Sequence, residues 1–278
     1  MDSGITDKAI IAGTGETEYV RGTDKSSRHL ILQAALAACA DAGVEPEAVD
    51  GVVMAMVDVP TNEDFVAALG IRDLRAHAHI HIGGASAVAG VLEAAAMVAA
   101  GRARRVLVAT GWRSYSGVRL GSEQAASVNL GAPGREIREN IEYPAGLVVP
   151  MQWYSLHANR WFYETKADPD GMKTVALTTR EHAHLNPKAY MKDRPLSAEQ
   201  YDTSPILVKP FHLYDISLET DGAAAVLVTS ADEASPGTHR SVYIAAGAEG
   251  HADVPDDLSS RPDILDLGIT KAAPRAFA

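Results

Sequence analysis

The residues with the greatest chemical potential lie in one short stretch, residues 80–86 (IHIGGAS). His81 is titratable, two glycines then permit a sharp turn, and Ala85 and Ser86 open a long apolar run. A helix that begins there offers unpaired N–H groups and the positive end of its dipole, which suits a developing oxyanion. We therefore take Gly84, Ala85, Ser86 and His81 as the candidate catalytic residues.

Three predicted elements position this turn. Residues 76–82 alternate with period two, as a strand does. Residues 85–100 are apolar on every side except at Ser86 and Glu93, which predicts a helix buried all round and a partner for Glu93. Gly101 is expected to end that helix. Residues 105–110 (RVLVAT) then predict a central strand that is covered on both faces.

The rest of the chain extends the same alternation of strand and helix. Strands are predicted at residues 8–13 and 52–57, with helices at 26–42 and 62–69. Ser26 or Ser27 can cap the first of these helices, and Gly43 can end it. This order predicts an α/β fold with a mainly parallel sheet. Further helices at 151–165 and 170–185 and a strand at 224–230 leave an inserted loop subdomain at about 113–215, with 186–215 irregular.

A weak internal repeat appears near the C-terminus. Residues 242–247 (VYIAAG) match 9–13 (AIIAG), and 259–265 (SSRPDIL) match the start of the first helix. A repeat this long predicts a duplicated α/β unit. We assign residues 1–235 to the first unit and 236–278 to the start of a second, incomplete unit, and we expect the natural chain to continue past Ala278.

Composition excludes several classes of protein. The 278 residues carry a net charge of −11, whereas nucleic-acid binding needs a basic face. Apolar runs are too short to span a bilayer, and the N-terminus lacks a signal pattern. The single cysteine, Cys39, is expected to be a buried helix residue, which fits a cytoplasmic protein.

Two tempting patterns have plainer interpretations. His77, His79 and His81 share one strand face, but a flat face does not converge three ligands, so we expect no metal. A pH-sensitive or catalytic role for one of them, His81 above all, stays open. Residues 13–15 (GTG) suggest a dinucleotide loop, but Glu18 stands where the third glycine should be, which favours an ordinary turn at a strand end.

Aromatic residues in the inserted region are candidates for substrate binding. Trp153, Tyr154 and Trp161 on the predicted helix 151–165 could line an apolar pocket, or they could pack that helix within the subdomain. Arginines in the preceding loop could meet phosphates or could be solvated charges; they are Arg113, Arg119, Arg135 and Arg138.

Several stretches together resemble the thiolase superfamily. The similarity is to its lipid-transfer-protein-type aldolases, which are related to the thiolase part of sterol carrier protein X. It covers essentially the whole chain and rests on AIIAGTGETEY, AALAACADAGVEPEAVDGV, IGGASAVAGVLEAAAMVAAGRARRVLVATG, HLNPKAYM, ETDGAAAVLV and SSRPDILDLGITKAAPRAFA.

The resemblance implies one reaction, and a missing cysteine argues against another. Thiolases open the buried helix with a nucleophilic cysteine, but this chain has Gly84 or Ala85 at that position. The resemblance then implies retro-aldol cleavage of a β-hydroxyacyl-CoA, expected to be a steroid side-chain thioester, to a ketone and a short acyl-CoA such as propionyl-CoA. The alternatives are a thiolase-like acyltransferase acting through Ser86 and a non-catalytic scaffold subunit that binds lipid or acyl-CoA.

The resemblance also implies partners and the remaining catalytic groups. The substrate carries coenzyme A, and no bound cofactor is expected. A homodimer should form through the histidine strand, and a small acyl-CoA-binding subunit with an OB-fold and zinc ribbon should accompany it. The acid and base are expected to be tyrosines of the second unit, beyond Ala278.

Overall fold

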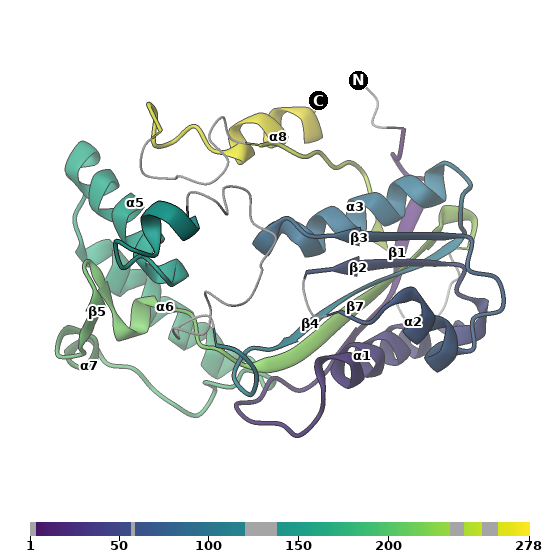
Figure 1. Ribbon diagram of the computed structural model, residues 1–278, viewed down its shortest axis with the longest axis horizontal. Helices are drawn as coiled ribbons and strands as arrows, with labels where there is room; N and C mark the ends of the chain where they lie inside the picture. The colour runs from purple at the N-terminus through teal and green to yellow at the C-terminus, as the bar shows by residue number, and fades with distance from the viewer. Residues whose placement is uncertain (1–3, 57–58, 120–137, 234–241, 252–260) are drawn as a thin grey trace.

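A six-stranded sheet forms the centre of the protein in the computed structural model, which describes residues 4–56, 59–119, 138–233, 242–251 and 261–278 (Figure 1). Its strand order is β3-β2-β4-β7-β1-β8. The bounds of the strands are Ala9–Glu16 for β1, Gly51–Ala55 for β2, Ala76–Ile80 for β3, Arg105–Arg113 for β4, Asp221–Ser230 for β7 and Val242–Tyr243 for β8.

Most strands of this sheet run in one direction. β2 pairs in parallel with both β3 and β4. β7 lies between β4 and β1 and is antiparallel to both, so β1 runs the same way as β2, β3 and β4. β8 adds an antiparallel edge beside β1. The predicted α/β class is confirmed, with β7 as an antiparallel strand inside a mainly parallel arrangement.

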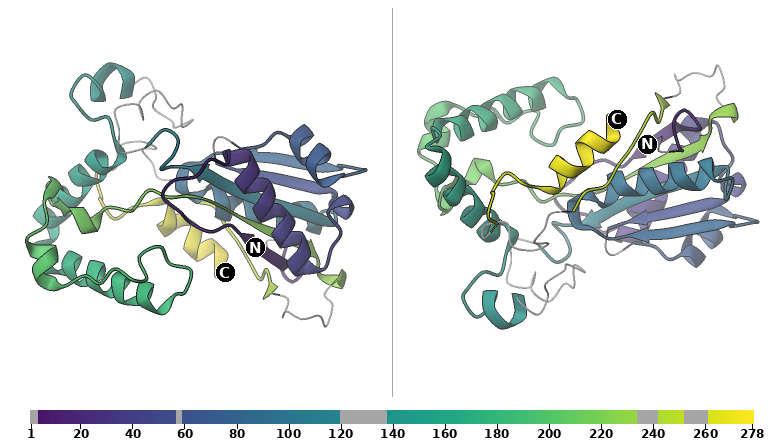
Figure 2. Two further views of the ribbon diagram at one scale, coloured as in Figure 1. Left: turned by 90° about the horizontal axis from the view of Figure 1, so that it is seen from below. Right: turned by 90° about the horizontal axis from the view of Figure 1, so that it is seen from above.

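Helices cover both faces of the sheet (Figure 2). α1 (Ser27–Ala42) lies on one face with the short α2 (Asn62–Leu69) beside it, and α3 (Ser86–Ala99) lies on the other. Alternate residues of β4 point to opposite faces of the sheet. Leu107 packs in the core beneath α1, while Val106 and Val108 pack in the core beneath α3. The sheet is therefore buried on both faces, as its apolar central strands predict.

The predicted helix ends are confirmed by their cap geometry. Ser26 Oγ accepts a hydrogen bond from the N–H of His29 at 3.1 Å, and Gly43 has φ of 65° in the left-handed region. Behind α3, Gly101 has φ of 68°, and its N–H donates to the carbonyl of Val98 at 3.0 Å. These local signals fix where the helices stop.

The prediction that α3 is buried all round is wrong. Its sheet-facing side is buried, but the side chain of Val88 is 76% exposed. Glu93 is half-buried, and no ion pair or hydrogen bond to it occurs in the described part of the chain. Residues near Gly247 cover only part of the outer side of α3. A Cβ added to Gly247 would lie 2.6 Å from Cδ1 of Leu92. An apolar composition alone does not guarantee a covering layer.

The glycines of the GTG stretch lie within β1 and not in a turn, which corrects the expected turn at the strand end. An added Cβ on Gly13 would lie 2.4 Å from the carbonyl oxygen of Ala38, and one on Gly15 would lie 2.1 Å from that of Ala34. Both positions therefore let the backbone of α1 approach β1 closely. This packing requirement accounts for both glycines, so a nucleotide-binding loop is not needed to explain them.

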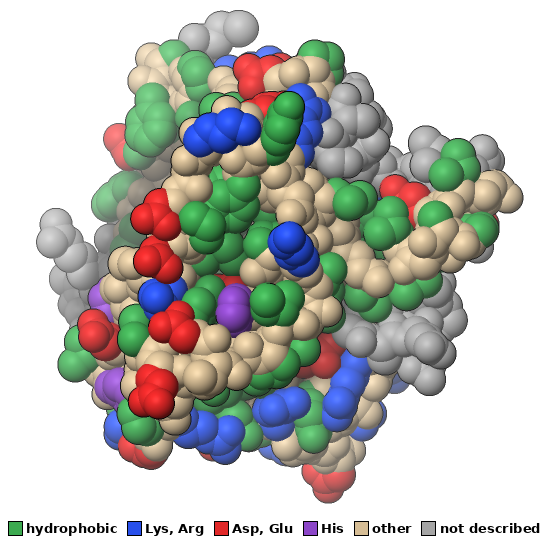
Figure 3. Space-filling view, turned by 90° about the vertical axis from the view of Figure 1, so that its left-hand side faces the viewer, with side chains coloured by type: hydrophobic (Ala, Val, Ile, Leu, Met, Phe, Trp, Pro, Cys, Tyr) green, Lys and Arg blue, Asp and Glu red, His purple; other side chains and the backbone are tan. Residues whose placement is uncertain are grey.

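The inserted region forms a separate lobe beside the sheet (Figure 1). Two long helices dominate it, and Figure 3 shows this end of the molecule with apolar side chains in a central hollow. The stretch 186–215 is less irregular than predicted, because it contains a short helix and a two-stranded sheet. The elements are a π-helix at Arg138–Glu142, α5 (Pro150–Thr165), α6 (Asp170–Leu185), α7 (Ala198–Asp202), β5 (Ile206–Val208) and β6 (Phe211–His212).

The elements observed near the C-terminus match the predicted repeat only in part. β8 spans two residues of the predicted strand 242–247, and α8 (Gly268–Ala276) begins later than the repeat predicts. Part of the repeated SSR triplet lies outside the described residues. At its end, the backbone of Arg261 and Pro262 is not helical, and their carbonyls accept hydrogen bonds from Arg160 of α5 in the inserted lobe.

Candidate functional site

The candidate site lies at the edge of the sheet where β1, β2, β3 and β4 all end. In α/β proteins the crevice outside the carboxyl ends of the strands is the usual ligand site. The turn after β3 carries the predicted residues 81–86, while the loops after β1 and β4 form the other part of this edge. The local sequence thus places several loops on one side of the molecule.

The turn itself is one short 3₁₀ segment, Gly83–Ala85, that leads directly into α3. Gly83 has φ of 67°, a conformation that favours glycine. Gly84 and Ala85 are exposed, and an added Cβ at Gly84 would meet nothing within 4 Å. Because the first N–H groups of a helix have no partner inside it, this turn can present donors to a ligand anion.

Ser86 is fully buried, with 0% of its surface exposed. Its Oγ accepts a hydrogen bond from the N–H of Ile82 at 2.9 Å and donates one to the carbonyl of Gly83 at 2.6 Å. The hydroxyl therefore closes the turn. A nucleophile must reach its substrate and be activated by a base. The contacts of Ser86 instead give it the part of a residue that holds the turn in shape.

His81 is half-buried at the end of β3, and its ring lies 6.3 Å from that of His79 with an angle of 13° between the planes. The Nε2–H of His79 donates to the carbonyl of Met56 at 2.7 Å. Met56 has φ of 81°, an unusual conformation for a side chain of this size. No local pattern in the sequence predicts this strained position, which lies one strand away from the candidate turn.

Metal binding gains no support from this geometry. Within residues 4–56, 59–119, 138–233, 242–251 and 261–278, no group of three or more His, Cys, Asp or Glu side chains is placed to hold an ion. His77 and His79 are exposed along a flat strand. Strand geometry keeps such side chains side by side and does not converge them.

The three predicted aromatic residues all lie on α5, in the inserted lobe. The Nε1–H of Trp153 donates to Glu142 at 2.7 Å, and Arg138 lies 4.6 Å from its ring centroid. Tyr154 is 56% exposed, and Trp161 meets Phe162 edge-on at 5.0 Å. Contacts within the lobe account for Trp153 and Trp161, and substrate binding by the three stays a prediction.

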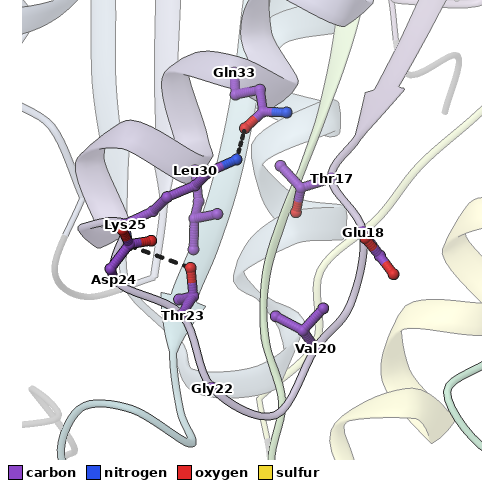
Figure 4. A pocket seen from close by; sticks show the side chains of 9 residues that line it. All are labelled: Thr17, Glu18, Val20, Gly22, Thr23, Asp24, Lys25, Leu30 and Gln33. Atoms are coloured by element: carbon purple, nitrogen blue, oxygen red, sulfur yellow. Dashed lines mark hydrogen bonds between the residues drawn. The ribbon is translucent and has the colours of Figure 1, made fainter.

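A pocket of about 510 Å³ lies between the loop after β1 and helix α1 (Figure 4). Lys25 Nζ donates to Oε1 of Gln33 at 3.0 Å on its wall. Sequence reasoning did not single out this loop, because its residues have no distinctive spacing. The lining residues are Thr17, Glu18, Val20, Gly22, Thr23, Asp24, Lys25, Leu30 and Gln33.

Asp221 at the start of β7 joins this loop to the loop after β4, and it is fully buried. Its carboxylate accepts hydrogen bonds from the N–H groups of Gly22, Tyr115 and Ser116 at 3.2, 2.9 and 2.9 Å, and from Ser116 Oγ at 2.6 Å. Burial alone would raise the pKa of Asp221, but these donors outweigh it and hold the pKa below its ordinary value. The residue belongs to the ETDGAA stretch, whose function the sequence did not reveal.

Comparison with known proteins gives a consistent result, although no family model matches the chain. It is 34% identical over 249 residues to a steroid side-chain-cleaving aldolase of Thermomonospora curvata, covering 87% of this chain and 62% of that protein. It is also 34% identical over 246 residues to the 17-hydroxy-3-oxo-4-pregnene-20-carboxyl-CoA lyase of Mycobacterium tuberculosis, covering 88% and 64% respectively.

A solved structure agrees with these relatives. The chain superposes on one described as an Ltp2-ChsH2(DUF35) aldolase with a TM-score of 0.82 and 32% identity, over 94% of this chain and 66% of that chain. The chain also superposes on the human mitochondrial 3-ketoacyl-CoA thiolase with a TM-score of 0.61 and 18% identity, over 88% of this chain and 71% of that chain, so it has the thiolase fold. It spans less than two thirds of the length of the two curated relatives. The expected fold class and resemblance are thereby confirmed.

No helix within the described ranges is both long and apolar enough to cross a membrane.

Proposed function

We propose that this chain, which has the thiolase fold, takes part in the retro-aldol cleavage of a β-hydroxyacyl-CoA, with a steroid side-chain thioester as substrate. In this reaction a base removes the β-hydroxyl proton, the hydroxyl oxygen forms a ketone, and the Cα–Cβ bond breaks. The electron pair passes to the thioester as an enolate, and an acid then protonates the α-carbon to give a short acyl-CoA such as propionyl-CoA. Oriented N–H donors at a developing oxyanion typically contribute about 3–4 kcal/mol each.

The turn at the start of α3 carries this proposal. Gly84 and Ala85 are exposed with helix-terminal N–H groups, and they are the donors we assign to the enolate oxygen. Ser86 is committed to the turn by two hydrogen bonds, and the only cysteine, Cys39, is buried in α1. The turn therefore supports an anion but supplies no nucleophile for acyl transfer.

The remaining catalytic groups, the partners and the compartment are also proposals. We assign the acid and base to tyrosines of a second thiolase-like unit, as the resemblance implies. We assign dimerisation to β3, an edge strand of the sheet that carries His77 and His79 on its exposed side. The solved structure with ChsH2(DUF35) in its name supports a partner subunit, and we propose that this partner is the small acyl-CoA-binding protein with an OB-fold and zinc ribbon that the resemblance implies. The cytoplasm is the proposed compartment, because Cys39 is a free thiol.

The test is a product assay on protein purified from its natural source together with any subunit that copurifies. A steroid β-hydroxyacyl-CoA is supplied, and mass spectrometry follows the ketone, the short acyl-CoA and the mass of each polypeptide. Ketone and acyl-CoA in equal amounts support the proposal. An acyl group on the peptide containing Ser86 would replace it with an acyltransferase. Tight binding without either product would replace it with a scaffold subunit.

A further inference from the structure

Two arginines from distant parts of the chain meet at one tyrosine ring. The guanidinium carbon of Arg21 lies 4.4 Å from the ring centroid of Tyr115, and that of Arg119 lies 4.1 Å from it. Arg119 Nε also donates to the backbone carbonyl of Tyr115 at 3.2 Å. Both arginines are exposed and Tyr115 is half-buried. Two positive charges are thus gathered on the surface of a chain whose net charge is −11.

Arg21 is one of several arginines that have no ion pair among the described residues. In the part of the chain that the structure describes, no carboxylate forms an ion pair with Arg21, whereas the exposed Arg72 is paired with Glu47 at 3.5 Å. A guanidinium that stacks on an aromatic face keeps the N–H groups at its edge available for hydrogen bonds. Arg21 therefore presents forked donors beside the ring of Tyr115, and Arg119 adds a second positive charge at the same ring.

Asp221 fixes the backbone on both sides of Arg21 and at Tyr115. The residues on both sides of Arg21 are tied to Asp221, because Val20 exchanges backbone hydrogen bonds with Asp221 at 3.1 and 2.7 Å and Gly22 N–H donates to its carboxylate. Tyr115 N–H donates to the same carboxylate, and Thr23 N–H donates to Ser116 Oγ at 3.0 Å. A site whose supports are already ordered loses less entropy when it binds.

We propose that Arg21, Tyr115 and Arg119 form a binding site for a phosphate group. Arginine forks match the geometry of phosphate oxygens, and charge-assisted hydrogen bonds of this kind are strong. The site lies in the loops after β1 and β4, at the same edge of the sheet as the turn before α3. That the phosphate belongs to the coenzyme A of the substrate rests on the proposed function; the phosphate site itself does not.

The experiment measures binding by calorimetry and needs no turnover. Inorganic pyrophosphate, coenzyme A and pantetheine, which has no phosphate, are titrated into the wild type and into Arg21→Gln, Arg119→Gln and Arg72→Gln. Arg72→Gln is the matched control, because it removes the same charge from an arginine that is 82% exposed and lies before β3, at the opposite edge of the sheet. Unfolding curves of all variants verify that each remains folded.

We expect Arg21→Gln and Arg119→Gln to weaken pyrophosphate binding at least tenfold and Arg72→Gln to change it less than twofold. Arg21→Lys should give an intermediate loss, because lysine keeps the charge without the fork. Equal losses in Arg21→Gln and Arg72→Gln, or no binding of pyrophosphate to the wild type, would overturn the site. If coenzyme A binds independently of Arg21 while pyrophosphate requires it, the site serves another phosphate-bearing ligand and the assignment to coenzyme A fails.

Discussion

The hydroxyl of Ser86 holds a turn whose chemistry depends on its backbone. In Ser86→Ala, the N–H of Ile82 loses its acceptor in a part-buried place, while the carbonyl of Gly83 loses the hydroxyl donor but still accepts from the backbone N–H of residue 86. An unsatisfied buried group costs about 1–3 kcal/mol, so we expect the free energy of unfolding to fall by that amount. Urea denaturation measures it. A variant as stable as the wild type would show that water replaces the hydroxyl and that the turn does not depend on it.

The low pKa of Asp221 has a consequence for acid stability. Its folded pKa lies below the unfolded value of about 3.9, so its contribution is fully present above that pH and is lost as the pH falls through the folded pKa. Asp221→Asn should lower the free energy of unfolding by about 2–3 kcal/mol at pH 7, since it replaces a buried acceptor of four hydrogen bonds.

The acid dependence distinguishes this effect from a general loss of stability. Between pH 5 and pH 3 the stability of Asp221→Asn should decline less steeply than that of the wild type. Asp73→Asn, at an exposed aspartate, is the control and should follow the wild type. Parallel curves for all three proteins would show that Asp221 has an ordinary pKa in the folded state.

Cys39 should be chemically silent in the folded protein. It is fully buried, and burial raises the pKa of its thiol to about 11. Because the thiolate is the reactive form, we expect an aromatic disulfide reagent at pH 8 to label native protein at least ~100-fold more slowly than unfolded protein. Stopped-flow absorbance gives both rates. Fast labelling of the native state would mean that α1 opens locally.

At the level of elements, the contact between α1 and β1 sets the tightest packing limit. A Cβ on Gly15 would lie 2.1 Å from the carbonyl oxygen of Ala34 and 2.4 Å from the backbone nitrogen of Ala38. Both are backbone atoms, so Gly15→Ala should force the helix outward and destabilise the fold by roughly 3 kcal/mol or more. Gly171→Ala, where an added Cβ meets nothing within 4 Å, is the control. Equal melting temperatures would contradict this prediction.

The sequence predicts elements better than it predicts their surroundings. Helix ends at Ser26, Gly43 and Gly101 follow from local cap chemistry, which a short stretch contains in full. The exposure of Val88 and the place of β7 between β4 and β1 depend on partners far away in the chain. Such pairings leave no local periodicity to detect.

The candidate site shows the same division. The turn at residues 83–85 could be predicted from its glycines, but the closure of that turn by Ser86 and the strain at Met56 could not. Asp221 anchors two loops whose residues lie about 100 and 200 positions before it in the chain. No local residue spacing could have predicted these contacts. The local sequence located the turn, and only the three-dimensional structure located the residues that support it.

At the level of the whole molecule, β7 is the strand that completes the sheet. It lies between β4 and β1, and every residue of β4 pairs with it. A truncated chain of residues 1–215 lacks β7, so its sheet would be split and we expect it to show no cooperative unfolding. A chain of residues 1–233 keeps β7 and should unfold cooperatively. Circular dichroism during urea titration compares the two, and a cooperative transition in the shorter chain would contradict the expectation.

The position of β7 also means that β1 is synthesised long before the strand with which it pairs. At 5–20 residues per second, the ribosome needs ~10–40 s to make the residues between the end of β1 at Glu16 and the start of β7 at Asp221. Throughout that interval β1 has no neighbouring strand, and β4, once it is made, is paired only with β2 on one side. We expect the growing chain to depend on chaperones that shield exposed strands, and translational pauses before codon 221 to increase its aggregation.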